Sequence, residues 1–585
     1  MEWKIDDFSN PLHDEVKNLL LDDEGDPALT EDLGEESDIE SQDEVEECQG
    51  DSGTEQDGEE TDEDEQDTDN PYYLGKDKKT KWSKKPPKKI RESDNILTRL
   101  PEVIGSAKNA RTAVECWNNL FTDILDIIVR CTNQYIDAIK DKFSGEGDVR
   151  PTDEIEVRAF IGLLYLAGAY RGNCQSLEEL WGTEGDGIPK FSLVMNLKRF
   201  KTLLRCLRFD DRTTRTHRKE SDRLAAIRDV FEKFVGNCQN SYLPGENVTI
   251  DEMLPGFRGR CAFRQHIPSK PNKYGIKLFA LVDARMIYTV NMEIYAGKQP
   301  TGPFCISNKP REVVKRLAEP LFGSGRNITA DNWFSDFDLI DDLRMQKLSY
   351  VGTVRKNNKQ LPPNFVNVKG KKQYRSMFGF NDGKVLVSYI PREKKNVILV
   401  SSLHDDDAID PGSGVQKKPE VITFYNLTKS GVDTLDQMCA AYSVSRNTKR
   451  WPMVIFFTML NVGGINSQVI YLGNQLQPLR RRVYLKTLAN ELVSGELRRR
   501  TTGIHSSLED RIKRYLSKDD LEKSPPKRRR CTTCTTETGH RRLSNYECHK
   551  CHNACCLSHA DMICQPCFSL CQCVSSAELL TSQSE

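Results

Sequence analysis

The sequence has no unbroken apolar run near the ~20 residues that a membrane-spanning helix requires, and its start, MEWKIDDFSN, lacks the apolar core of a signal peptide. Cysteine is sparse over most of the chain: nine of the 19 cysteines are scattered through the first 530 residues, and ten lie in the last 55. Scattered single cysteines are typical of a reducing compartment, whereas paired ones indicate metal binding. These absences predict a soluble intracellular protein with no membrane partner.

Basic residues are absent from one long stretch. Between Asp22 and Asp69 there are 25 Asp and Glu residues and no Lys or Arg, although the net charge of the whole chain is only -3, so the remainder carries about +22. A segment this acidic and this poor in apolar residues cannot offset the entropy of ordering, and we expect residues 1–95 to be a disordered tail and basic linker. The basic remainder favours a polyanion such as nucleic acid as partner, although a merely soluble surface is the alternative.

The hydrophobic pattern changes character twice along the chain. Apolar residues at three and four spacing predict helices up to about residue 240 and again after about 430, whereas short β-branched and aromatic runs begin near 245. These runs predict three strands, then helix, strand, helix and strand, and hence a multidomain α/β fold with a mixed sheet. The predicted segments are a helical part at 96–246, an α/β part at 247–357, an insertion of short polar strands at 358–418, a second α/β part at 419–442, a second helical part at 443–518 and a cysteine-rich domain at 528–575.

Acidic residues stand near the ends of three of these elements. The strand NVTIDEM carries Asp251, and the strand NITAD ends in Asp331. The stretch FYNLTKSGVDTLDQM is typical of a helix start and places Asp433 and Asp436 on neighbouring positions of one face, where they also fit a solvated helix surface. If Asp251, Asp331 and Asp433 converge, they form an oxygen-rich site that suits two Mg²⁺ ions and phosphodiester chemistry.

Five motifs follow one another along the chain: TIDEMLPGFRGRCAFRQHIPSKPNKYGIK, NITADNWFSD, VGTVRKN, YNLTKSGVDTLDQM and SRNTKRWPM. In order and separation they resemble the piggyBac family of cut-and-paste DNA transposases, and the likeness extends over residues 95–575. The resemblance implies an RNase H-like catalytic domain interrupted by an insertion and flanked by a split helical domain for dimerisation and DNA binding. It also implies a catalytic triad of Asp251, Asp331 and Asp433, with Asp436 as a supporting acid.

The resemblance also implies a reaction. In such transposases a water nicks the transposon end, the freed 3′-hydroxyl forms a hairpin with the opposite strand, and the reopened ends join a TTAA target. The expected protein is a homodimer that binds double-stranded DNA, both transposon ends and target, with two Mg²⁺ per active site. Basic runs at 75–91 and 525–530 favour a nuclear location, although the first also fits a linker and the second fits phosphate contacts.

Basic side chains crowd the segment that follows Asp251, where they would neutralise DNA phosphates near the scissile bond. A solvated loop explains the same residues without a partner. An Arg-Trp pair at 450 and 451 matches a pair in the family, and its Trp fits a base-stacking aromatic as well as it fits a core residue. The predicted DNA-binding residues are Arg258, Arg260, Arg264, Lys270, Lys273, Arg450 and Trp451.

From residue 531 the chain reads CTTCTTETGHRRLSNYECHKCHNACCLSHADMICQPCF. Pairs of the form C-x-x-C and C-x-x-H hold tetrahedral Zn²⁺, and four pairs predict two ions, one on the first and third pairs and one on the second and fourth. A module this small needs the metals to stay folded, and the resemblance adds that it binds transposon-end DNA. The predicted ligands are Cys531 with Cys534, Cys548 with Cys551, Cys556 with His559, and Cys564 with Cys567; Cys555, Cys571, Cys573, His540, His549 and His552 are the substitutes, Cys555 for Cys556 above all.

Two other functions fit parts of the sequence. A domesticated DNA-binding protein would keep the scaffold without transposition, although the presence of all three acids disfavours decay of the active site. Cross-brace zinc modules also occur in chromatin readers and ubiquitin ligases, but the triad and the basic run before Cys531 favour DNA. The leading hypothesis is therefore a metal-dependent DNA transposase with an Asp triad.

Overall fold

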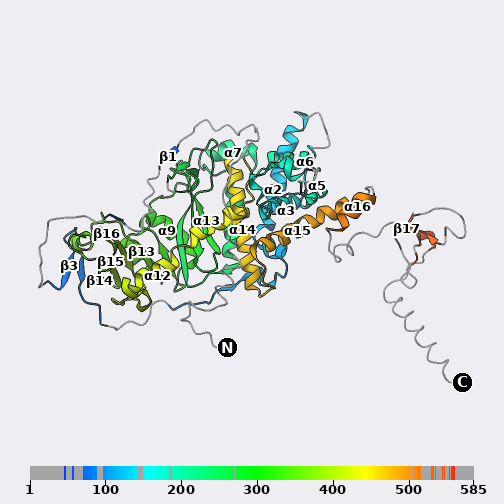
Figure 1. Ribbon diagram of the computed structural model, residues 1–585. Coiled ribbons are helices and arrows are strands. Elements are labelled where there is room, and N and C mark those ends of the chain that lie inside the picture. The colour runs from blue at the N-terminus through cyan, green and yellow to red at the C-terminus, as the bar shows by residue number, and fades with distance from the viewer. Residues whose placement is uncertain are drawn as a thin grey trace, which may run out of the picture. The chain divides into compact units, whose positions relative to one another are not determined.

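The chain divides into two compact units, Met1–Arg500 and Thr501–Glu585, and each is described by itself (Figure 1). The computed structural model describes residues 45–47, 56–57, 70–88, 96–142, 149–182, 187–268, 270–501, 506–515, 529–532, 534, 543–544, 546, 553 and 555–559.

Eleven strands of the described residues form one sheet in the first unit. One half of it consists, in spatial order, of β11 (Thr289–Ile294), β10 (Leu278–Asp283), β7 (Asn247–Met253), β12 (Asn327–Ala330) and β13 (Ser349–Thr353). In this half β10 is antiparallel to β7 and β11, whereas β7, β12 and β13 are parallel. The helices α9 (Pro310–Ala318) and α10 (Phe337–Met345) connect β11 to β12 and β12 to β13, so the predicted mixed α/β order is confirmed.

The predicted insertion continues this sheet instead of forming a separate one. Its strands are β14 (Ser376–Asn381), β15 (Lys384–Arg392) and β16 (Lys395–Ser401), and they form an antiparallel meander. β16 pairs with β13, where Ser401 stands opposite Val351. The strands are also less polar than expected, because Val385 and Val387 are buried in one cluster with Tyr425 of α12 (Glu420–Thr428), a helix that the sequence pattern did not predict.

Residues 70–88, which the sequence placed in the disordered segment, instead form part of the same sheet. The strands β3 (Tyr72–Leu74) and β4 (Lys81–Ser83) make a hairpin, and β4 pairs with β14. Trp82 is fully buried, and its indole Nε1 donates a hydrogen bond to the Gln360 carbonyl at 2.9 Å. Burial of this large aromatic side chain offsets the entropy of ordering a polar segment, which composition alone did not reveal.

Two short strands of the acidic stretch also pair with the body of the first unit. β1 (Val45–Glu47) runs parallel to β8 (Arg264–His266), and β2 (Gln56–Asp57) runs antiparallel to β16. β8 in turn pairs with β9 (Tyr274–Ile276). At these positions, too, the acidic segment departs from the predicted disorder, because its backbone adds to the edges of existing strands.

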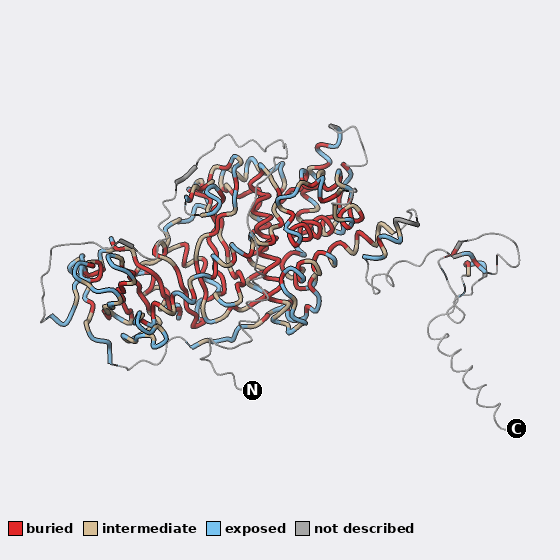
Figure 2. Tube along the Cα trace, viewed as in Figure 1, coloured by how far each residue is buried: buried red, intermediate tan, exposed pale blue. Residues whose placement is uncertain are grey.

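Helices from two distant parts of the sequence share one core. The first part contains α2 (Ala113–Ile139), α3 (Glu154–Ala169), α4 (Leu177–Leu180), α5 (Pro189–Val194), α6 (Leu197–Cys206), α7 (Arg212–Lys219) and α8 (Arg228–Gln239), and the second contains α14 (Trp451–Gly473) and α15 (Arg481–Arg500). The hydroxyl of Tyr165 on α3 accepts from Trp117 Nε1 at 3.0 Å and donates to the Leu460 carbonyl of α14 at 2.6 Å. Buried residues run continuously through these helices and the strands (Figure 2).

Of the described helices, α14 alone is long and apolar enough, by length and composition, to cross a membrane, but its apolar window is 100% buried in the fold. The sequence analysis found no apolar run of this length, because polar residues such as Asn466 interrupt the apolar residues of the helix. Asn466 holds α14 against β11: its amide Nδ2 donates to the Thr289 carbonyl and its Oδ1 accepts from the Thr289 amide, both at 2.9 Å. At Gly463 an added Cβ would lie 2.4 Å from Phe121, so only glycine permits this approach to α2.

The second unit contains α16 (Ser506–Lys513) and a short antiparallel pair, β17 (Arg529–Arg530) with β18 (Leu543–Ser544). A 3-10 helix, η7 (Leu557–His559), follows. A tight cluster of cysteines is buried beside these elements.

Candidate active site

Two of the predicted acids lie at the same end of adjacent parallel strands. The register of β7 and β12 pairs Ile250 with Ala330. Asp251 follows Ile250, and Asp331 follows Ala330. Asp331 Oδ1 accepts a hydrogen bond from the Trp333 amide at 2.9 Å, which fixes the turn into α10. The strand order therefore brings these two carboxyl groups together, as the sequence predicted.

The third acid comes from α13 (Gly431–Ala441), a helix that packs on β7 and β10. Three buried threonines hold its start. Thr249 Oγ1 donates to the Thr428 carbonyl at 2.6 Å, and the hydroxyls of Thr329 and Thr428 are hydrogen-bonded at 2.8 Å. Thr249 and Thr329 precede Asp251 and Asp331 by two residues, so each threonine shares a strand face with its aspartate and faces the helix.

Close packing at Gly431 continues the same junction. A Cβ there would lie 2.6 Å from Thr249 Oγ1, so the helix starts against the strand only because position 431 has no side chain. Two residues later Asp433 is 67% exposed, and Asp436 is partly buried one turn further along. The helix begins at Gly431, directly after Ser430, as the sequence predicted, although Ser430 makes no side-chain capping bond.

Burial and neighbouring negative charge act together on these carboxyl groups. Burial, with the charges of Glu252 and Asp331, raises the pKa of Asp251 well above its ordinary value. Burial and the charge of Glu252 raise the pKa of Asp331 to about 7, and burial raises the pKa of Asp436 to about 7 as well. Like charges gathered in a partly desolvated place favour a bound cation, which would restore ordinary acidity.

Glu252 takes part in this cluster although sequence reasoning singled out only Asp251 in the TIDE motif. Its charge acts on Asp251, Asp331 and Asp436 alike. A strict alternation of strand faces directs Glu252 away from Asp251, and this is why the pattern gave no signal for it. Glu252 still lies within β7, which ends at Met253, but its charge is close enough to act on all three aspartates.

The basic segment after Asp251 divides into two kinds of residue. Arg258, Arg260 and Lys273 are exposed, as a role in phosphate binding requires. Arg264 is partly buried, and its Nη1 donates to the Gly259 carbonyl at 2.7 Å. Lys270 faces the acids instead: its Nζ lies 3.6 Å from Asp433 Oδ1 and its side chain is only 16% exposed.

Arg450 and Trp451 are both buried, with 5% and 4% of their surface exposed. The guanidinium of Arg450 donates to the carbonyls of Arg205 and Leu207 at 3.1 and 2.6 Å, where α6 ends. Trp451 packs edge-on against Phe263 at 5.1 Å between ring centroids. In this structure neither side chain offers a surface to DNA, and the core interpretation of Trp451 fits its position.

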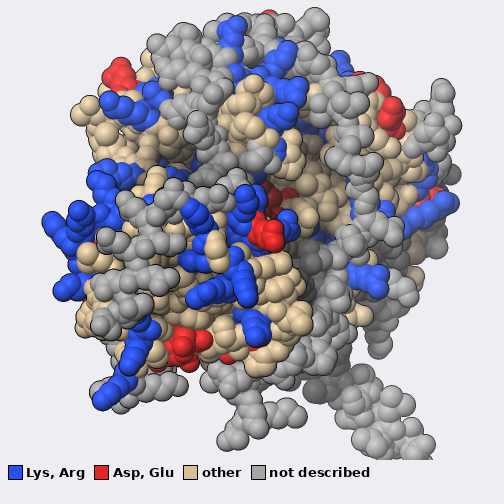
Figure 3. Space-filling model, turned by 60° about the vertical axis from the view of Figure 1, so that its left-hand side comes forward, with Lys and Arg blue, Asp and Glu red and all other residues tan. Residues whose placement is uncertain are grey.

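Figure 3 turns the left-hand side of Figure 1, which carries β14, β15 and β16, toward the viewer. Groups of positively charged side chains lie on this face. Lys and Arg side chains lie in several groups over that face, and fewer acidic side chains lie among them. A surface of this kind attracts a polyanion.

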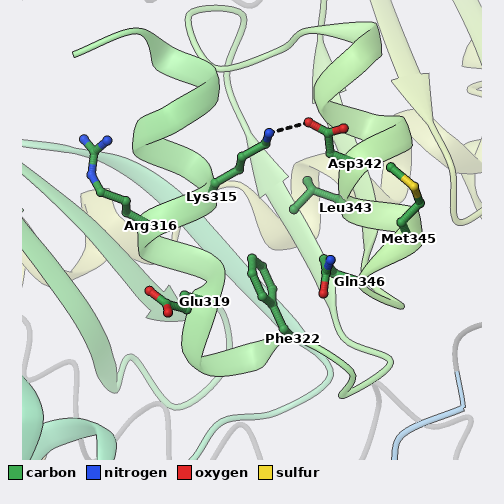
Figure 4. A pocket seen from close by; sticks show the side chains of 8 residues that line it. All are labelled: Lys315, Arg316, Glu319, Phe322, Asp342, Leu343, Met345 and Gln346. Carbon is green, nitrogen blue, oxygen red and sulfur yellow. Dashed lines mark ion pairs between the residues drawn. The ribbon is translucent and has the colours of Figure 1, made fainter. Parts of the chain in front are cut away.

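A separate pocket of 330 Å³ lies between α9 and α10 (Figure 4). Lys315 and Asp342 form an ion pair of 2.5 Å across it. The pocket contains none of the predicted catalytic residues and so is distinct from the acid cluster. Its lining residues are Lys315, Arg316, Glu319, Phe322, Asp342, Leu343, Met345 and Gln346.

In the second unit Cys531, Cys534 and Cys556 come together: of the residues described, only they bring three possible metal-ligand atoms within 4.8 Å of one another. Cys534 Sγ and Cys556 Sγ are 3.6 Å apart. Cys555 lies beside the cluster, with its amide bonded to the Tyr546 carbonyl. His559 belongs to η7, but its side chain lies outside the description, as do Cys548, Cys551, Cys564 and Cys567.

Comparison with known proteins identifies the family. A family model described as Transposase IS4 matches residues 112–468, which include Asp251, Asp331 and Asp433. A piggyBac transposase solved by cryo-EM in a synaptic complex with hairpin DNA is 35% identical, with a TM-score of 0.67, and the match covers 80% of this chain and 100% of that one. The chain belongs to the piggyBac transposase family.

Two human relatives have a lower sequence identity to this chain than the solved transposase has. PiggyBac transposable element-derived protein 3 is 24% identical over 457 residues, which cover 74% of this chain and 73% of the relative. The human chimeric ERCC6-PGBD3 protein matches equally well over 457 residues, but these are 41% of its length. The resemblance drawn from the five motifs is thereby confirmed.

Proposed function

We propose that this transposase cuts and rejoins DNA by phosphoryl transfer at Asp251, Asp331 and Asp433, with Asp436 in support. The observation that carries the proposal is the convergence of acids from β7, β12 and α13 on one place beside an exposed basic segment. The order of strands, three antiparallel and then two parallel, supports an RNase H-like catalytic core. DNA is the expected substrate because the solved relative was determined with hairpin DNA.

The donor set fits magnesium. Carboxylate oxygens are the ligands that Mg²⁺ prefers, and the raised pKa values of Asp331 and Asp436 indicate that burial outweighs the nearby protein cations, which favours an added cation. Asp251, Asp331 and Asp433 would hold two ions, which supply polarisation of the attacking oxygen and stabilisation of the leaving oxygen in an in-line displacement. The threonines behind the acids keep the three carboxylates in register, and Arg258, Arg260 and Lys273 would bind the phosphates on either side of the scissile bond.

The individual steps of the reaction are inferred from the resemblance to the family. We infer nicking of transposon ends, excision through a DNA hairpin and integration at TTAA targets, carried out by a homodimer in the nucleus. These steps require two active sites that act on paired ends, and the helical core of α2, α3, α14 and α15 is the expected dimerisation and DNA-binding part.

The decisive experiment is a strand-cleavage assay on family-type ends with Mg²⁺, run beside a binding assay on the same DNA. Asp251→Asn, Asp331→Asn and Asp433→Asn are each expected to lower cleavage by roughly a hundredfold or more, because each removes a ligand charge while keeping its shape. DNA binding should survive, and Asp436→Asn should be milder. The matched control is Asp338→Asn, since Asp338 on α10 is 67% exposed, like Asp433, but lies outside the cluster.

Variants that cleave as well as the parent would refute the triad. A parent that binds the DNA but never cleaves it would instead support the second candidate, a domesticated DNA-binding protein. That candidate is favoured by the human relative, whose name describes it as derived from a transposable element.

For the cysteine-rich unit we propose two Zn²⁺ per chain and recognition of transposon-end DNA. The cluster of Cys531, Cys534 and Cys556 supports one ion on the first and third pairs, since three thiols at this spacing suit tetrahedral zinc. Metal analysis of the purified chain should give two zinc ions, and chelation should unfold this unit. Cys548→Ser should abolish specific end binding while the first unit stays folded; a zinc content of one or none would refute the paired assignment.

A further inference from the structure

Lys270 is the one predicted DNA-binding residue whose side chain points into the acid cluster. Its ammonium lies 3.6 Å from Asp433 Oδ1 and donates a hydrogen bond to the Glu252 carbonyl at 3.0 Å. A short loop holds it there: the Lys270 amide donates to the Ile267 carbonyl, and the Ile267 amide donates to the Lys273 carbonyl. Ile267 is itself buried, so the loop is anchored in the core.

Four carboxyl groups act on this ammonium. Burial alone would lower the pKa of Lys270, but the carboxylates of Asp251, Glu252, Asp436 and Asp433 raise it. These groups come from β7 and from α13, and the loop contributes a positive charge beside them. Arg355 is a second cation that acts on the cluster, through Asp331. A lysine ammonium is a compact point charge on a flexible stem and can therefore occupy a place that suits a metal ion.

We propose that Lys270 is the resident counter-cation of the metal-free active site, and that it must move away when divalent ions bind. This rests on the proposed function, since it takes the same acids as the metal ligands. A cation bound by Asp433 would stand within a few ångströms of the ammonium, and two like charges at that distance repel strongly where water is partly excluded. Until it moves, Lys270 keeps the exposed Asp433 next to the other acids and lowers the affinity of the site for metal.

Displacement of the Lys270 ammonium by metal would also couple metal binding to DNA binding. A displaced ammonium needs another anion, and a DNA phosphate at the site supplies one. By thermodynamic linkage, metal should then strengthen DNA binding as much as DNA strengthens metal binding. Lys270 is thus a positioning residue that makes the site fill with metal mainly when DNA is present.

The test is a Mn²⁺ titration of the full-length chain without DNA. Binding that remains in the Asp331→Asn variant is subtracted, so that other metal sites do not contribute. Lys270→Met and Lys270→Gln should each bind Mn²⁺ more tightly by about tenfold, because the competing charge is gone. Lys270→Arg should behave like the parent. The matched control is Lys298→Met, because Lys298 is an exposed lysine that follows β11 and has no part in the proposed site; it should also behave like the parent.

A second measurement records DNA affinity with and without Ca²⁺. The parent should bind more tightly with the ion, and Lys270→Met should lose most of that gain. Unchanged Mn²⁺ affinity in both neutral variants, with parental thermal unfolding, would overturn the role of Lys270 and leave the proposed function intact. If the parent shows no Mn²⁺ binding that depends on Asp331, both proposals fail.

Discussion

At the scale of single residues, the most informative contacts lie behind the acids. Thr249, Thr329 and Thr428 are almost fully buried, and Thr428 at the end of α12 is hydrogen-bonded both to Thr249 of β7, through its carbonyl, and to Thr329 of β12, through its hydroxyl. Buried hydroxyls with satisfied partners fix geometry, because breaking one bond leaves another polar group unpaired. We therefore regard these threonines as positioning residues for the aspartates that follow them.

Thr428→Val tests this role, since valine keeps the shape and removes the hydroxyl. The Thr329 hydroxyl loses a partner, and α13 is held less firmly, so Mn²⁺ affinity and Mg²⁺-dependent cleavage should fall by about tenfold. DNA binding should stay at the parental level. Thr289→Val is the control, because Thr289 is equally buried on β11 but its Oγ1 has no partner in the described structure. Equal effects of the two substitutions would show that Thr428 acts only through general stability.

A second residue-scale prediction concerns His404, which follows β16. Burial lowers its pKa from 6.5 to about 4, against the opposing charges of Asp406 and Asp405, and its Nδ1 is hydrogen-bonded to Ser401 Oγ at 2.8 Å. Because the folded pKa lies below the unfolded one, this residue contributes stability above pH 6.5 that is lost as the pH falls toward 4. The loss is at most about 3 kcal/mol.

His404→Asn removes that titration and keeps a polar group near the Nδ1 position. Thermal unfolding of parent and variant should therefore converge, or reverse in order, as the pH falls from 7.5 to about 4.5. Parallel curves for the two proteins over this range would contradict the prediction.

At the scale of elements, the hairpin of β3 and β4 shows how an N-terminal segment becomes part of the insertion. Its main anchor is Trp82, which lies against Phe337 of α10 at 5.5 Å between ring centroids. The hairpin thereby links the insertion strands to the helix that follows Asp331. Loss of this anchor should loosen the outer half of the sheet while the strands that carry the acids remain folded.

Trp82→Ala should cost the insertion about 3 to 5 kcal/mol of local stability, since a large buried side chain is removed. Hydrogen exchange should show faster exchange in β14 and β15 and little change in β7. Tyr72→Ala, in the same hairpin but 46% exposed, should leave the exchange of these strands near the parental rate. Unchanged protection of β14 in Trp82→Ala would show that the hairpin is dispensable for the insertion.

At the scale of the whole molecule, the charge of the chain is divided between an acidic start and a basic body. β1 of the acidic stretch pairs with β8, whose loops carry Arg258, Arg260 and Lys273. We therefore expect the acidic segment to compete with DNA for the basic segment next to the active site. This contact gives a structural basis to an effect that net charge alone predicts.

Deletion of residues 1–69, which keeps the hairpin, should strengthen non-specific DNA binding, by roughly threefold or more at low salt and less at high salt. Phosphorylation of Ser37, Ser41, Thr54 and Thr61, each with an acid three residues on, should act in the opposite direction by adding roughly -1.5 to -2 of charge per site. Fluorescence anisotropy over a salt titration measures the first effect, and an unchanged affinity would reject it. Mass spectrometry that finds the four sites unmodified in cells would reject the second.

The sequence alone determined the elements that carry the acids and the chemistry that each of them brings. Alternating and helical periodicity predicted β7, β12, α13 and the order between them, because such patterns depend only on neighbours along the chain. Asp251 and Asp331 could be placed side by side because residues at the ends of parallel strands meet at one edge. Cysteine pairs likewise indicate a metal site, because the spacing of their ligands is a local property of the sequence.

The tertiary structure decided everything that depends on a partner distant in sequence. The sequence predicted Lys270 as a DNA-binding residue, and only the fold shows that it lies against Asp433. It predicted Arg450 and Trp451 as DNA contacts, with a core role equally open for Trp451, and only the fold shows that they are buried against α6 and Phe263. Residues 70–88 had the composition of a linker, but one buried indole ordered them on a sheet formed elsewhere. Burial and hydrogen-bond partners are properties of the packed chain, and composition or periodicity cannot specify them.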